Sequence, residues 1–72
     1  MILTARINRN AIEIFDATTG GIHRTHSLPP GTYSGLVIGS DTVTVTIHTA
    51  YSGDKIRTIN MQTGGMISDI SM

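Results

Sequence analysis

An internal repeat is the feature of this 72-residue sequence that most restricts its fold. Residues 12–22 (IEIFDATTGGI) align without a gap with residues 56–66 (IRTINMQTGGM), so that apolar positions coincide and a Thr-Gly-Gly triplet closes each segment. Extending the alignment backwards, Leu3, Ala5 and Ile7 match Val43, Val45 and Ile47 if the connection that follows is a few residues shorter in the first copy. A repeat distance of about 40 residues is the period of four-stranded propeller blades. We therefore expect two copies of one unit, over about residues 1–28 and 33–72.

The residue pattern inside each copy is that of β-strands. Val43, Val45 and Ile47 alternate with threonines, and a two-residue period indicates a strand whose two faces meet different surroundings. Runs rich in Ile, Val, Thr and Tyr predict about seven short antiparallel strands, at residues 3–7, 12–15, 22–28, 34–38, 42–48, 55–61 and 66–70. Turns rich in Gly, Pro and Asn separate them, and no stretch keeps a helical period for three turns. The sequence thus predicts a single all-β domain over residues 1–72.

Two blade-like units are too few to close a ring. The second copy begins with an extra strand at 34–38, which the first copy lacks. Repeat proteins gain stability by stacking neighbours, so an isolated pair of blades leaves sheet faces uncovered. A cyclic homo-oligomer, for instance a trimer, would close the ring through heterologous contacts and become propeller-like. The alternative is a small monomeric β-barrel or sandwich.

One segment resembles known propeller blades. Residues 41–47 (DTVTVTI) and 53–65 (GDKIRTINMQTGG) look like a blade of the WD40 or quinone-type propellers, with a polar residue and Thr-Gly where those blades turn into their last strand. The chain is also similar to small phage-encoded β-repeat proteins. These resemblances imply a propeller-like assembly. The Trp-Asp and Gly-His signatures of WD40 repeats are missing, as are the tryptophans of two-blade sugar-binding lectins.

Composition excludes several classes of partner. Five Lys and Arg balance five Asp and Glu, and this zero net charge argues against nucleic acid or an anionic membrane as a partner. With no cysteine there are no disulfides and no thiolate sites. No signal peptide or membrane-spanning run is recognised, which leaves a cytoplasmic or virion-associated location open.

No catalytic or metal-binding pattern is visible along the chain. His23 and His26 are three apart, which places them on opposite faces of a regular strand, and His48 is remote in sequence. The acidic residues are spread singly, and neither a nucleophile elbow nor a phosphate-binding loop is present. We therefore expect no enzyme activity, no metal site and no cofactor.

The two Thr-Gly-Gly turns are the best candidates for ligand binding. Backbone N–H groups in such turns can form a concavity for an anion, and a neighbouring arginine can add charge-assisted hydrogen bonds. An exposed tyrosine beside the proline pair would add a contact residue. The candidate ligand-binding residues are Arg24, Arg57, Gly20, Gly21, Gly64, Gly65 and Tyr33. The competing interpretation is that these glycines only supply the positive φ of a tight turn.

Two functions of different classes follow. The first is a non-enzymatic, oligomeric, propeller-like binding module for a small polar or anionic ligand. The second is a structural or interaction protein, such as a minor component of a phage particle, which pairs symmetric β-edges and binds no ligand.

Overall fold

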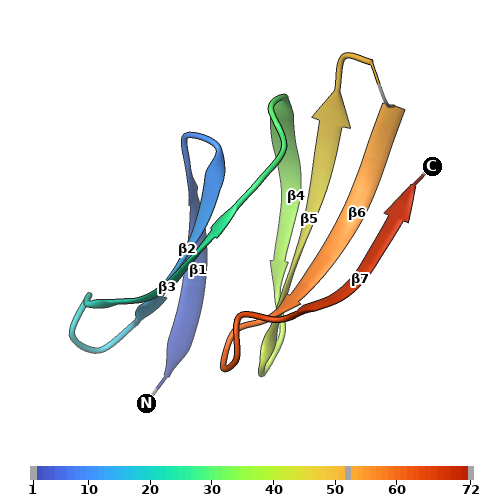
Figure 1. The fold of residues 1–72 in the computed structure, drawn as a ribbon. Helices are drawn as coiled ribbons and strands as arrows, with labels where there is room; N and C mark the ends of the chain where they lie inside the picture. Colours follow the sequence, from blue (N-terminus) through green and yellow to red (C-terminus); the bar gives the residue numbers. More distant parts are fainter. Residues whose placement is uncertain (1, 52, 72) are drawn as a thin grey trace.

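The computed structural model describes residues 2–51 and 53–71, and this part of the chain is built from seven strands, as predicted (Figure 1). They are β1 (Leu3–Asn8), β2 (Ala11–Asp16), β3 (Ile22–Ser27), β4 (Thr32–Ile38), β5 (Thr42–Thr49), β6 (Gly53–Asn60) and β7 (Met66–Ser71). Sheet A has the order β1-β2-β3 and sheet B the order β4-β5-β6-β7, with every pair antiparallel. The two end positions of the predicted domain lie outside the described residues.

The two sheets stand side by side, and an extended crossover leads from β3 back to β4 (Figure 1). Between the sheets, β1 and β4 are neighbouring strands. The core fills this space with alternate residues of the strands, namely Leu3, Ala5, Ile12, Ile14, Leu28, Val43, Val45, Ile47, Ile59 and Met61. Because the ladders do not continue from one sheet into the other, the chain forms two blade-like units and does not close into a barrel.

The two turns that carry Thr-Gly-Gly have the same hydrogen-bond pattern. Asp16 Oδ1 accepts hydrogen bonds from the N–H groups of Thr18 and Thr19, and Asn60 Oδ1 does the same for Gln62 and Thr63. Both turns also contain a threonine hydroxyl that accepts from the second glycine N–H, at 3.2 and 3.1 Å. Gly20 and Gly64 have φ of +79° and +78°, so each turn needs glycine for its backbone conformation.

The register of the first strand in each copy corrects the sequence alignment by one residue. In sheet A, Ala5 pairs with Ile14, whereas in sheet B the residue that pairs with the equivalent Thr58 is Thr44. The N–H groups of Ala17 and Met61, also equivalent, bond to the carbonyls of Ile2 and Asp41. Leu3, Ala5 and Ile7 therefore correspond to Thr42, Thr44 and Thr46, not to Val43, Val45 and Ile47. The alignment by hydrophobicity was wrong here because a one-residue shift exchanges the two faces of a strand.

This correction defines how the two units are related. The face of sheet A that packs into the core is equivalent to the outward face of sheet B, which carries Thr42, Thr44, Thr46, Ile56 and Thr58 and is called the threonine face. The outward face of sheet A carries Thr4, Arg6, Asn8, Glu13 and Phe15 and is called the arginine face. It is equivalent to the core face of sheet B. The two units therefore pack through non-equivalent faces, in a head-to-tail manner.

Candidate functional site

The turn between β6 and β7 lies against two basic side chains of β3. Arg24 Nε donates a 3.0 Å hydrogen bond to the carbonyl of Gln62, and His23 Nε2 lies 3.4 Å from the same oxygen. A Cβ at Gly64 would be 2.9 Å from Arg24 Cδ, so the glycine lets the arginine stem lie against the turn. The structure thus brings together Arg24, Gly64 and Gly65 among the predicted ligand residues, and places Gly20 and Gly21 in the separate turn between β2 and β3.

The amide groups of both turns are already engaged. The N–H groups of Gln62, Thr63, Gly64 and Gly65 all bond within the turn, to Asn60 or Thr63. An anion would have to compete with these bonds for the same donors. The exposed Arg24 guanidinium is therefore the better contact for a ligand than the backbone of the glycine turns.

Arg57 occupies a different environment, between the two sheets. Its side chain is only 12% exposed, and it donates to Asp69 Oδ2 of β7 at 3.2 Å and to His26 Nε2 of β3 at 3.3 Å. Its Nε is buried and has no partner among the described residues. Arg57 therefore ties sheet B to sheet A, and its charge is already paired with a carboxylate.

The same cluster affects the titration of His26. Burial, and then the positive charge of Arg57, lower the pKa of this imidazole below its ordinary value of 6.5. Both causes disfavour the protonated ring. The neutral form of His26, which accepts a hydrogen bond from Arg57, is therefore the form that the fold stabilises.

Tyr33 holds the crossover in place. Its hydroxyl donates to the carbonyl of Pro29, and it lies 3.3 Å from Asn10 Oδ1 in the hairpin between β1 and β2. Its ring packs against the core, so Tyr33 is less accessible than the sequence suggested. A shallow cavity of about 380 Å³ lies nearby, lined by Pro29, Pro30, Gly31, Thr49, Ala50 and Tyr51.

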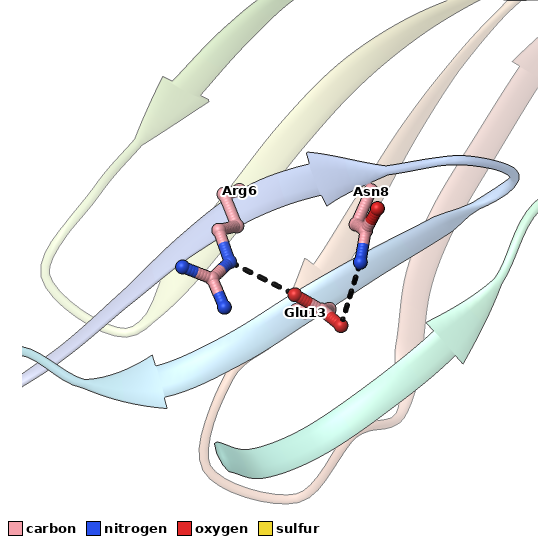
Figure 2. Close-up of polar contacts among 3 residues, drawn as sticks. All are labelled: Arg6, Asn8 and Glu13. Carbon is pink, nitrogen blue, oxygen red and sulfur yellow. Dashed lines mark hydrogen bonds and ion pairs between the residues drawn. The ribbon is translucent and has the colours of Figure 1, made fainter. Parts of the chain in front are cut away.

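The arginine face carries a compact polar network (Figure 2). Glu13 of β2 accepts hydrogen bonds from Arg6 Nε at 2.8 Å and from Asn8 Nδ2 at 3.2 Å. These two bonds, that of Arg6 first, lower the pKa of the Glu13 carboxyl. The Arg6 guanidinium also lies 4.8 Å from the centre of the Phe15 ring, within the range of a cation–π contact. The charges of this face are thus satisfied within the face itself.

The three histidines lie in three different environments, and the described residues contain no group of three metal-ligating side chains. His48 lies on the threonine face, far from the β3 histidines, and hydrogen-bonds to Ser34 and Asp54. In residues 2–51 and 53–71, no helix has the length and apolar character needed to cross a membrane. Comparison with known proteins found no matching family model, no matching curated protein and no matching solved structure.

Proposed function

We propose that the chain is a ring-forming binding module, in which copies of itself stack head to tail into a β-propeller. The partner is a second copy, whose arginine face packs on the threonine face of the first. Propellers contain about four to eight blades and each chain supplies two, so a ring needs about two to four chains, and the trimer is the middle of this range.

The observation that carries this proposal is the packing of the two units through non-equivalent faces. A sandwich with two-fold symmetry would pair equivalent faces and leave nothing to repeat. Here the contact between sheet A and sheet B leaves one face of each kind uncovered. A heterologous contact of this type repeats from copy to copy until it closes into a ring or continues as a filament.

The two uncovered faces have the composition of surfaces that can be buried. On the threonine face, Val37 and Ile70 are exposed beside threonine methyl groups, and Ser68 and Thr58 complete the row. On the arginine face, the one acidic group is already neutralised by Arg6. Burying these faces against each other removes apolar surface from water.

The repeat also predicts one contact across the ring. Within the chain, His26 meets Arg57, and the equivalent positions are Ile70 and Glu13. Ile70 of one copy is therefore expected to face Glu13 of the next. Native mass spectrometry of the wild type should give two or more times the 7.7 kDa chain mass, and three times that mass for the expected trimer. Ile70→Glu should weaken association by about tenfold or more, because the new carboxylate would face Glu13 while the neighbouring Arg6 is already paired, and facing like charges in an interface cost several kcal/mol.

Two variants control for this experiment. Met66→Glu changes a residue of the same strand with the same exposure (54% against 57%) but on the opposite face, so it should leave the ring intact. Ile70→Lys places a positive charge opposite Glu13 and should also assemble. A wild type that stays at the mass of one chain contradicts the proposal. Equal disruption of the assembly by Ile70→Glu and Met66→Glu also contradicts it.

For the ligand, we propose a small anion at the Arg24 guanidinium, where His23 and the turn between β6 and β7 adjoin it. Arg24 is exposed, and its Nε donates a hydrogen bond to the carbonyl of Gln62. No carboxylate of the described residues forms an ion pair with it, so its charge is available to an anion.

Inorganic phosphate at ten times its dissociation constant should raise the melting temperature by about 4 °C or more relative to chloride of equal ionic strength. Arg24→Gln should abolish this rise, while Arg9→Gln, in the exposed β1–β2 hairpin, should keep it.

The second candidate function is that of a structural protein that pairs through its β-surfaces. It assumes the same ring as the first function but no ligand. It is favoured by the internal bonding of the turn amides. A ring that forms but shows no phosphate-dependent shift in melting supports the structural role and contradicts the anion site.

A further inference from the structure

A serine, a histidine and an aspartate from three adjacent strands form a hydrogen-bonded row on the threonine face. Ser34 Oγ of β4 lies 2.8 Å from His48 Nε2 of β5, and His48 Nδ1 lies 3.1 Å from Asp54 Oδ1 of β6. His48 and Asp54 are directly opposite each other in the ladder, while Ser34 is diagonal to His48. The sequence did not reveal this row because its members are 14 and 6 positions apart on separate strands.

We propose that Ser34 is a nucleophile activated by His48, and that the site reacts with small activated esters and related acyl or phosphonyl electrophiles. The two contacts are those that nucleophilic serine catalysis requires: a base within hydrogen-bonding reach of the hydroxyl, and a third group that orients the base. With Nδ1–H directed to Asp54, the neutral imidazole presents the lone pair of Nε2 to the serine hydroxyl. Ser34 and His48 are the catalytic residues, and Asp54 is a positioning residue.

The strand is irregular directly after Ser34. The β4–β5 register shifts between Ser34 and Val37, so that Gly35 and Leu36 have no partner in the ladder. Gly35, the next residue after the nucleophile, has a φ of +61°. Bulges re-aim side chains and leave residues unpaired. The N–H groups of the bulge are therefore the donors nearest in sequence to Ser34 for an oxyanion that develops on the substrate.

The reaction balances with water as the only second reactant. Ser34 Oγ attacks the ester carbonyl, a C–O bond forms, and the hydroxyl proton passes to His48 Nε2. When the tetrahedral adduct collapses, the bond to the leaving alkoxide breaks and that oxygen takes the proton from Nε2. Water then attacks the acyl-serine with His48 again as the base, which releases the acid and restores the hydroxyl.

This inference is independent of the proposed ring, because all three residues belong to one chain. The two ideas are also compatible. Within the chain β4 neighbours β1, whose equivalent in sheet B is β5. Sheet A has no strand equivalent to β4, so a following copy would leave β5, the strand of His48, without this neighbour. The site would then lie in a hollow at each subunit junction.

The test is covalent labelling of the intact protein with an alkyl fluorophosphonate, in which an Oγ–P bond forms and fluoride leaves. Peptide mass mapping is expected to place the adduct on Ser34 and not on Ser40, an exposed serine in the turn after β4. Ser34→Ala should remove the adduct and Ser40→Ala should not. His48→Gln should slow labelling by about a hundredfold, the usual contribution of a positioned base.

Asp54 is tested by rescue. Asp54→Asn should slow labelling by about tenfold or more, because the carboxylate that orients the His48 ring is lost, whereas Asp54→Glu, which restores a carboxylate, should recover part of the rate. Mapping the adduct to Ser34 or Ser40 uses the wild type alone, so this result does not depend on whether any variant folds. Equal labelling of Ser34 and Ser40, or a rate unchanged by His48→Gln in a folded variant, overturns the nucleophile. Labelling measured separately on each species seen by native mass keeps this result distinct from that of the ring.

Discussion

Replacing Gly31 by alanine is expected to destabilise the protein by about 3 kcal/mol or more, as the combined cost of backbone strain and steric overlap. Gly31 lies in the crossover between β3 and β4. A Cβ at this position would be 2.2 Å from the carbonyl oxygen of His48 and 3.1 Å from its carbonyl carbon. Its φ of +152° is also a conformation that L-residues avoid. The crossover would have to move away from β5, and with it the strand start at Thr32.

Gly20→Ala is the matched control. Gly20 also has a positive φ, of +79°, but beyond its chain neighbours no atom lies within 4 Å of the place that a Cβ would take. Only the conformational strain remains there, so a cost of about 1 kcal/mol is expected. Urea unfolding followed by circular dichroism measures both variants. Equal losses would contradict the close approach of the crossover to β5.

The strands and their grouping could be predicted from the sequence because they depend on local signals. Alternation of Val43, Val45 and Ile47 with threonines marks β5, and the two Thr-Gly-Gly triplets mark equivalent turns. Each of these signals is contained in a stretch of a few residues. The seven strands of the structure follow from them with shifts of only a few residues at the ends, such as the start of β4 at Thr32.

The relation between the two units could not be predicted in this way. Matching by hydrophobicity makes Ala5 equivalent to Val45. The hydrogen-bond register of the two sheets makes it equivalent to Thr44 instead. The apolar residues of both β1 and β5 face the same core, although they occupy non-equivalent faces of their units. Hydrophobicity reports burial, and burial here arises from which faces meet, which no single strand encodes.

The candidate sites could be predicted only where one segment carries them. The Thr-Gly-Gly turns are local and visible in the sequence, whereas the interior position of Arg57 depends on β6 facing β3 across the core. Nothing in the run Lys55 to Thr58 distinguishes a buried arginine from an exposed one. The row of Ser34, His48 and Asp54 is invisible in the sequence for the same reason, since it exists only when three strands are in register.

Arg57→Ala is expected to destabilise the protein by about 2 to 4 kcal/mol, because removing one partner of a largely buried ion pair leaves the other without compensation. Asp69 would lose its guanidinium, His26 would lose its donor, and space would open between the sheets. Arg6→Ala is the control, since Arg6 forms a shorter ion pair, 2.8 Å, in which its side chain is 58% exposed. An exposed pair of that kind contributes about 0 to 1 kcal/mol. Similar losses in the two variants would contradict the inter-sheet role of Arg57.

The pH dependence separates this role from a simple loss of packing. In the folded protein the pKa of His26 is lowered below 6.5, so the unfolded chain takes up the proton more readily. The contribution of His26 to the free energy of unfolding is therefore fully present above pH 6.5. It is lost as the pH falls from there through the lowered folded pKa of His26. Arg57→Ala removes the positive charge that is one of the two causes of the lowering, so its free energy of unfolding should vary less over this range. Urea unfolding at a series of pH values tests this, and a pH dependence as steep as that of the wild type would show that Arg57 does not act on His26.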